Sequence, residues 1–405
     1  MSDFCQPGLV TTLHRLNHDG LLRLESELER HTRSTPIGLV LPALYSEFQT
    51  PAMRGIVTEL GKVRYLNRIV LALDRANSGE YEHARSFFRD FKTPVTILWM
   101  DSEPVQELFR TLAEKGLPSG DGGKGRSCWL ASGYLLACGD CDVIAIHDCD
   151  IVNYERKMLA RLCYPLVHPA MDFEFCKAFY SRVADRMYGR VTRLFAAPLI
   201  RALDDIVPAA PLLRFLDSFR YLLAGEVSMK KSLAASFQIP SNWGLEIGTL
   251  AEVFRNVPAQ RVCQVDLADN YEHKHQSLSA ADPTKGLVRM SREIATALLR
   301  SMAAEGIVLD GGALRTLEVR YLRIAEDMVN RYEADALLNG LTFDRHAENT
   351  AVTVFAHSLA QAEAEFVKDP LGLPPIPSWR RVISAAPDFY ARLKDAAAVQ
   401  QPSQS

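Results

Sequence analysis

The sequence lacks the features of several large classes of protein. Its 46 basic and 49 acidic side chains nearly balance, to a net charge of −3, so no broad positive field would attract nucleic acid. No uncharged stretch is long enough to cross a membrane. The first residues, Met1–Pro7, contain no basic segment followed by an apolar one, as a secretory signal would. We therefore expect a soluble, cytoplasmic protein that binds neither nucleic acid nor membranes.

The cysteines also lack a metal-binding pattern. All eight are scattered along the chain, and the close pair Cys138 and Cys141 has no second pair at the spacing of a zinc ribbon. Free cysteine is among the most buried residue types. We expect reduced thiols that are partly buried.

The chain is longer than one average domain. It has 405 residues, and its 48% hydrophobic content suffices for a large core. Apolar side chains recur at helical spacing near the start of the chain and again beyond about residue 280. The predicted divisions are an N-terminal helical segment at 1–35, a central α/β domain at 36–280, a helical region at 281–398 and a disordered tail at 399–405.

The central domain alternates between two kinds of segment. Short apolar runs, typical of buried strands, lie at 37–41, 69–73, 95–100 and 143–146. Polar stretches of helical character separate them, at 53–65, 82–91 and 128–137. This alternation predicts an α/β fold with a mainly parallel sheet flanked by helices. Ligands of such sheets bind beyond the carboxyl ends of the strands.

Two carboxylates follow the fourth apolar run, in Asp148-Cys-Asp150. Side chains alternate along an extended strand, so both point the same way and can share one cation. A hard divalent metal such as Mg²⁺ or Mn²⁺ takes a few protein oxygens and completes its shell with phosphate and water. Taken alone, the pattern is also compatible with helix caps or turn formers.

Three further polar segments are candidates for a site. Lys124 ends a glycine-rich loop that lacks the spacing of a P-loop but suits a phosphate or nucleotide, or is simply flexible. Arg190 and Thr192 form a compact set of donors for a phosphate or carboxylate. His273 and His275 follow an apolar run with an acid, so they are either structural or include a metal ligand.

Taken in order, these segments resemble the glucosyl-3-phosphoglycerate synthases, a family of retaining GT-A glycosyltransferases (glycosyltransferase family 81). The resemblance covers roughly residues 36–295. It rests on eight motifs in the same order: Pro42-Ala-Leu, Gly123-Lys-Gly, Asp148-Cys-Asp, Gly189-Arg-Val-Thr with Ala197-Pro-Leu, Gly225-Glu, Trp243-Gly-Leu-Glu-Ile-Gly, Glu272-His and Met290-Ser-Arg.

The resemblance implies a Rossmann-like GT-A fold, with a donor half at 36–150, an acceptor half at 151–280 and a helical C-terminal extension that forms a homodimer. Its donor and acceptor would be an NDP-glucose and D-3-phosphoglycerate. The implied catalytic residues are Asp148, Glu246 and Lys124. The implied donor-binding residues are Pro42, Ala43, Leu44, Glu47, Asn77, Ser78, Lys124, Asp148, Cys149 and Gly225. The acceptor would bind Gly189, Arg190, Val191 and Thr192, and Mg²⁺ (or Mn²⁺) would bind Asp150 and His273.

The sequence departs from the family pattern at three places near the donor. Glu47 stands in Tyr-Ser-Glu-Phe, where many members carry Asn-Glu-Glu. The turn after Asp74 reads Arg-Ala-Asn-Ser instead of Ser-Gly-Ser, and Tyr271 replaces a common arginine. The donor therefore stays open between UDP-glucose, GDP-glucose and GDP-mannose.

Two other functions use the same residue types. A nucleotidyltransferase also places paired carboxylates and Mg²⁺ beside a sheet, but it releases pyrophosphate. A non-catalytic sugar-nucleotide-binding protein would bind the donor without turnover. The products of the reaction distinguish these alternatives.

Overall fold

The computed structural model describes residues 6, 8–17, 20–207, 210–272 and 286–399. Its centre is one eight-stranded sheet in the order β1-β8-β6-β7-β5-β2-β3-β4. All neighbouring strands are parallel except β7, which is antiparallel to both β5 and β6. The mainly parallel α/β sheet predicted from the sequence is confirmed. The strands are β1 (Thr11–Leu13), β2 (Ile37–Leu44), β3 (Leu66–Asp74), β4 (Val95–Trp99), β5 (Val143–Ile146), β6 (Phe175–Phe179), β7 (Val227–Lys230) and β8 (Val262–Asp266).

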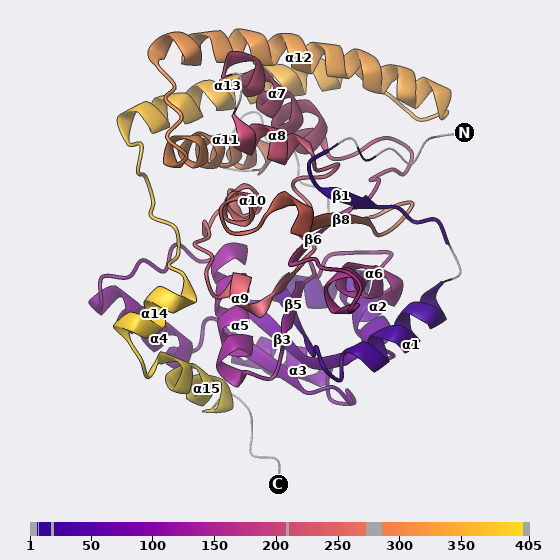
Figure 1. The fold of residues 1–405 in the computed structure, drawn as a ribbon, viewed down its shortest axis with the longest axis vertical. Helices are drawn as coiled ribbons and strands as arrows, with labels where there is room; N and C mark the ends of the chain where they lie inside the picture. The colour runs from indigo at the N-terminus through magenta and orange to yellow at the C-terminus, as the bar shows by residue number, and fades with distance from the viewer. Residues whose placement is uncertain (1–5, 7, 18–19, 208–209, 273–285, 400–405) are drawn as a thin grey trace.

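Helices follow most strands and cover both faces of the sheet (Figure 1). The α-helices of the first half are α1 (Leu21–His31), α2 (Pro51–Leu60), α3 (Ser78–Ser86), α4 (Glu103–Glu114), α5 (Lys124–Cys138), α6 (Arg156–Val167) and α7 (Ala197–Ile206). Those of the second half are α8 (Pro211–Asp217), α9 (Lys231–Ala234), α10 (Leu245–Asn256), α11 (Gly286–Ala304), α12 (Gly311–Leu338), α13 (Arg345–Lys368), α14 (Trp379–Ala385) and α15 (Phe389–Val399). Three shorter turns are η1 (Tyr45–Gln49), η2 (Val191–Ala196), which is π-helical, and η3 (Ala259–Arg261).

Alternate residues of the central strands supply two hydrophobic cores. On β2, Leu39 and Leu41 face one core, while Val40 faces the other. Both faces of the sheet are therefore apolar, as expected for strands covered on each side. The first core packs against α1, α2, α3 and α6, and the second against α4, α5, α10 and the C-terminal helices.

The strand at one edge of the sheet was not predicted. Thr11–Leu13 falls in the segment expected to be helical, but it forms β1 and pairs with β8. Its three residues are too few to show an alternating pattern. The helix predicted from the leucine spacing is present as α1, in which Leu24 and Leu28 are buried.

The C-terminal helices form two groups (Figure 1). Helices α11, α12 and α13 pack together with α7 at one end of the molecule, while α15 returns to pack against α4 and α5. At that return Trp379 lies against α5, where a Cβ on Gly133 would be 1.8 Å from the indole ring. Among the described residues, no helix combines the length and apolar character needed to cross a membrane.

Candidate functional site

The carboxyl ends of β2, β3 and β5 meet at one edge of the sheet. The pairing of β2 with β3 brings Leu44 beside Asp74, and β5 leads directly into Asp148 and Asp150. Turn η1 follows β2 at once, so Glu47 is buried close to this edge. The sheet register thus brings the ends of these three strands together at one corner, which we call the donor corner after the predicted donor residues that it contains.

Lys124 joins two carboxylates at the donor corner. Its Nζ lies 2.8 Å from Oδ1 of Asp148 and 3.2 Å from Oε1 of Glu246. Lys124 is the first residue of α5, and Glu246 lies in the first turn of α10. Burial alone would lower the pKa of Lys124, but the two carboxylates raise it well above its usual range. The structure therefore brings together all three residues predicted to be catalytic.

Gly225 lies directly against the ion-pair group, which consists of Lys124, Asp148 and Glu246. A Cβ on Gly225 would lie 2.5 Å from Oδ2 of Asp148 and 2.5 Å from Nζ of Lys124. Such contacts are shorter than real Cβ atoms make, so a side chain there would displace one of the charged groups. This residue was predicted to touch the donor, and its place beside Asp148 is consistent with that prediction.

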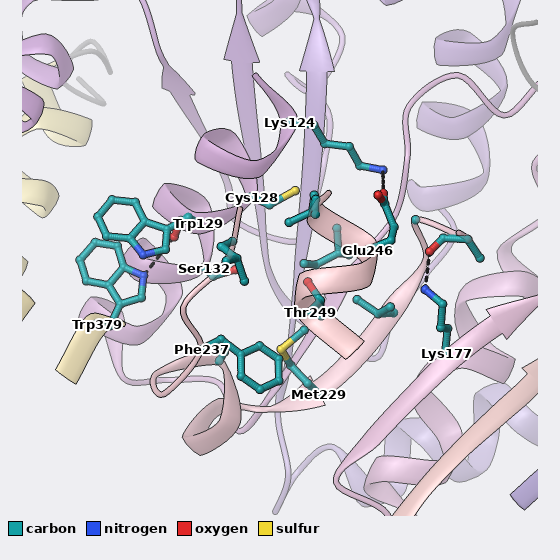
Figure 2. A pocket seen from close by; sticks show the side chains of 17 residues that line it. Lys124, Cys128, Trp129, Ser132, Lys177, Met229, Phe237, Glu246, Thr249 and Trp379 are labelled. Carbon is teal, nitrogen blue, oxygen red and sulfur yellow. Dashed lines mark hydrogen bonds and ion pairs between the residues drawn. The ribbon is translucent and has the colours of Figure 1, made fainter. Parts of the chain in front are cut away.

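A cavity of about 60 Å³ lies behind the ion-pair group (Figure 2). Lys124 and Glu246 are among its lining residues, and most of the others are apolar, including Met229 and Phe237. The lining also includes Trp379, which stacks on Trp129 with ring centroids 4.2 Å apart. The cavity is thus mainly apolar with a few charged side chains in its lining, and it is much smaller than the roughly 300 to 1,000 Å³ of a typical ligand pocket.

The buried Lys177 supports the chain beside the cavity (Figure 2). It lies on β6 and donates a hydrogen bond of 2.6 Å to the carbonyl oxygen of Ala224, the residue before Gly225. Burial lowers the pKa of Lys177 to about 8. The sequence analysis did not select Lys177, although a lone lysine within the apolar run Phe-Cys-Lys-Ala-Phe is the available signal.

The buried carboxylate of Glu226 continues this support on the other side of Gly225. It accepts hydrogen bonds from the hydroxyl groups of Tyr180, at 2.8 Å, and of Tyr271. The two tyrosine rings stack 3.7 Å apart. Burial, together with the charge of Asp148, raises the pKa of Glu226. Tyr271, noted as a departure from the family pattern, is therefore part of a buried hydrogen-bonded cluster.

Asp150 and His273 are the two predicted metal ligands. The residue before His273, Glu272, is hydrogen-bonded to residues that follow Asp150 closely in the chain. The amide of Val152 donates a hydrogen bond of 2.7 Å to the carbonyl oxygen of Glu272. Asn153 also accepts from the amide of Glu272, at 3.0 Å. His273 and His275 fall outside the described residues, and no cluster of three metal-binding side chains occurs within them. Val152 and Asn153, which follow Asp150 closely in the chain, are thus hydrogen-bonded to Asn270 and Glu272.

The remaining predicted donor residues line the ends of β2 and β3. Pro42, Ala43 and Leu44 are the last three residues of β2. Cys149, which stands between the two aspartates in the sequence, is buried. Asn77 and Ser78 begin α3, where Oδ1 of Asn77 accepts from the amide of Glu80 at 3.0 Å. This cap occupies the amide oxygen of Asn77 and fixes its side chain at the exposed helix start.

The predicted acceptor residues lie in a different structural setting. Gly189 has a φ of +75°, and Arg190, Val191 and Thr192 lead from it into the π-helical turn η2. Nε of Arg190 donates a hydrogen bond of 2.8 Å to Glu348, which belongs to α13 in the C-terminal region. The sequence analysis did not find Glu348, because no local pattern marks it. We call residues 182–192 the acceptor segment.

Comparison with known proteins identifies relatives over almost the whole chain. A glucosyl-3-phosphoglycerate synthase of Persephonella marina is 46% identical over 393 residues, 97% of each chain. The enzyme of that name from Methanococcoides burtonii is 36% identical over 399 residues, again 97% of each chain. No protein-family model matches the sequence.

Solved structures resemble the fold more distantly. A glucosyl-3-phosphoglycerate synthase from Mycobacterium tuberculosis, crystallised with Mn²⁺, UDP-glucose and phosphoglyceric acid, gives a TM-score of 0.54 at 24% identity. The match covers 75% of this chain and 89% of that one. A crystal structure of the same enzyme with Mn²⁺, UDP and glucosyl-3-phosphoglycerate gives 0.53 at 23% identity, over 75% and 90%. These similarities confirm the predicted fold.

Proposed function

This chain belongs to the glucosyl-3-phosphoglycerate synthase family, and from that premise we propose that it transfers glucose from an NDP-glucose to D-3-phosphoglycerate. The transfer would retain the anomeric configuration and release a nucleoside diphosphate. The observation that carries this proposal is Lys124 held between Asp148 and Glu246 beyond the carboxyl end of β5. The UDP-glucose and phosphoglycerate bound by the mycobacterial enzyme support the same substrates here.

The ion-pair group suits the hydroxyl groups of a hexose. The carboxylates of Asp148 and Glu246 accept hydrogen bonds from hydroxyls, and the ammonium of Lys124 donates to them. Each group already has a charged partner within 3.2 Å, so its orientation is set before the sugar binds. Such preorganisation lowers the cost of holding the donor for attack.

Asp150 and His273 would hold a divalent cation, Mg²⁺ or Mn²⁺, which when bound would neutralise charge on the leaving diphosphate. The bond from the anomeric carbon to the diphosphate oxygen would break while the acceptor hydroxyl oxygen forms the new bond on the same face. The hydroxyl proton would leave with the departing diphosphate. Arg190, with the backbone of Gly189 and the hydroxyl of Thr192, would hold the anionic acceptor in register.

The proposal is tested by measuring release of nucleoside diphosphate. UDP-glucose, GDP-glucose and GDP-mannose are each mixed with 3-phosphoglycerate, with Mg²⁺, with Mn²⁺ or with EDTA. We expect metal-dependent release that requires 3-phosphoglycerate, fastest with UDP-glucose, and an α-linked product by NMR. Pyrophosphate release would indicate a nucleotidyltransferase, and saturable donor binding without any turnover would indicate a binding protein.

The domain boundaries, the cytoplasmic location and the homodimer stay predictions. We propose that the helical C-terminal region provides the dimer contact, in addition to its contacts within the chain. Light scattering of the purified protein measures the molar mass directly. A monomer at enzyme concentrations used in the assay would contradict the proposed dimer without affecting the proposed reaction.

A further inference from the structure

One buried carboxylate is shared by two arginines of the acceptor segment and the turn that follows it. Oε1 of Glu348 lies 2.8 Å from Nε of Arg190, and Oε2 lies 2.5 Å from Nη2 of Arg193. The side chain of Glu348 is 5% exposed, that of Arg193 is 8% exposed and that of Arg190 is 31% exposed. The carboxylate is thus enclosed, whereas the outer arginine still reaches solvent.

The C-terminal helices hold the acceptor segment and η2 at several points. Glu348 lies in the first turn of α13, whose start is capped by Asp344. From α12, the hydroxyl of Tyr321 donates to the carbonyl oxygen of Leu194 at 2.9 Å. The amide of Thr342 donates to the carbonyl oxygen of Asp185 at 2.8 Å. The C-terminal region, predicted to form a dimer contact, therefore also contacts the predicted acceptor site within the same chain.

The two arginines have different tasks. Arg193 also donates to the carbonyl oxygens of Met187 and Tyr188, at 3.3 and 3.2 Å, and lies over the ring of Tyr332. Through these contacts Arg193 has a structural role: it links η2 to the backbone of the acceptor segment. Arg190 is bound to Glu348 through Nε, at one corner of its planar guanidinium group.

We propose that Glu348 is a positioning residue for the acceptor: it fixes Arg190 by Nε so that the two terminal nitrogens face a carboxylate or phosphate group. A guanidinium group binds an oxyanion best when two parallel N–H groups are presented together. Fixing the plane in advance reduces the rotamer freedom that binding would otherwise remove. This inference rests on the proposed function, because it requires an anionic acceptor.

A simpler role for Glu348 gives the opposite prediction. Two guanidinium groups and one carboxylate leave a net positive charge at this place, and Glu348→Gln would increase it. If Glu348 only competed with the acceptor for Arg190, that substitution would lower the KM for 3-phosphoglycerate. If Glu348 positions Arg190, the same substitution raises it. The sign of the change therefore separates the two roles.

The test is steady-state kinetics of Glu348→Gln, Arg190→Ala and the double variant. For Glu348→Gln we expect the acceptor KM to rise about tenfold, the scale of one charge-assisted hydrogen bond, with the donor KM unchanged. In the Arg190→Ala background the same change should add nothing further. Glu365→Gln is the matched control, because Glu365 lies on the same helix but pairs with Arg292.

Three results would overturn the inference: a lower acceptor KM, effects that add in the double variant, or equal changes in both KM values. If Glu348→Gln does not fold because Arg193 is left unpaired, Arg193→Met is compared with Arg193→Met/Glu348→Gln. An unchanged acceptor KM between those two would also contradict it. Wild-type protein that shows no phosphoglycerate-dependent release contradicts the proposed function itself, whereas an active wild type with an unaffected Glu348→Gln contradicts only this inference.

Discussion

The donor corner and the acceptor segment are built by different means. The donor corner is assembled by the sheet, because the register of β2, β3 and β5 brings the residues after each strand together. The acceptor segment lies outside the sheet and is held by side chains from helices far along the chain. Rigid backbone pairing positions the first, and buried charge positions the second. Substitutions should therefore affect the two regions in different ways.

The largest effect is expected at the metal side of the donor corner. Asp150→Ala should reduce kcat on the order of a thousandfold, because charge on the leaving group is no longer neutralised. Removal of metal from the wild type with EDTA should have an effect of similar size. Thermal unfolding checks that the variant stays folded. Full activity in Asp150→Ala would contradict the assignment of this residue.

The next effect concerns Lys177, which donates to the carbonyl oxygen of Ala224 beside the donor corner. Its folded pKa of about 8 lies below the usual value of 10.5, so the folded state loses the proton first as the pH rises. The free energy of unfolding contributed by Lys177 should therefore increase between pH 8 and pH 10.5, on the order of 3 kcal/mol. Urea unfolding of wild type and Lys177→Met at several pH values measures it. A difference between the two proteins that does not change with pH would contradict the lowered pKa.

Gly225→Ala tests how tightly the donor corner is fixed. The added Cβ would displace Asp148 or Lys124, and we expect kcat to fall about a hundredfold, the cost of a misplaced catalytic group. Gly55→Ala is the control, because no atom lies within 4 Å of its added Cβ. If Gly225→Ala kept wild-type kcat, the ion-pair group would not be the sugar site.

Arg190→Ala tests the other region. The acceptor KM should rise roughly thirtyfold, since a bidentate charged contact is lost, while the donor KM stays the same. Arg186→Ala is the control from the same segment, where Arg186 pairs with the neighbouring Asp185. Equal changes in both KM values would show that Arg190 holds the fold and not the acceptor.

The smallest effect is expected for a helix cap. Asn77→Ala removes the cap of α3 and should destabilise the protein by about 1 kcal/mol, with a modest rise in donor KM. Asp344→Ala removes the cap of α13, where Asp344 accepts from the amide of Ala347, at similar cost in stability. Unfolding curves and donor titrations compare the two. If both variants changed the donor KM equally, Asn77 would have no specific role in donor binding.

The same contrast explains which residues were predictable. Apolar runs that end in polar residues predicted β2, β3, β4 and β5, and with them the donor corner. Strand β7, Val-Ser-Met-Lys, has no such run and was not predicted. Lys177 was missed because its one signal, a single lysine within the apolar run Phe-Cys-Lys-Ala-Phe, shows burial but no partner. Local patterns suffice where neighbouring elements of the sheet build the site.

Glu348 could not be predicted for a different reason. It lies 158 residues from Arg190, and nothing in the sequence around it marks a partner in the central domain. Pairing of buried charges depends on how helices pack, which the spacing of apolar residues on each helix does not determine. The family motifs recognised in the sequence also end near residue 295, before α12 and α13 begin.

The stacked indoles behind the cavity have a consequence for how the protein is made. Trp379 donates to the carbonyl oxygen of Trp129, 250 residues earlier in the chain. At typical rates of synthesis the ribosome needs about 10 to 50 s to make that intervening length. Throughout this time the cavity lacks Trp379 from its lining. The buried stack of Trp129 and Trp379 therefore cannot form until translation is nearly complete.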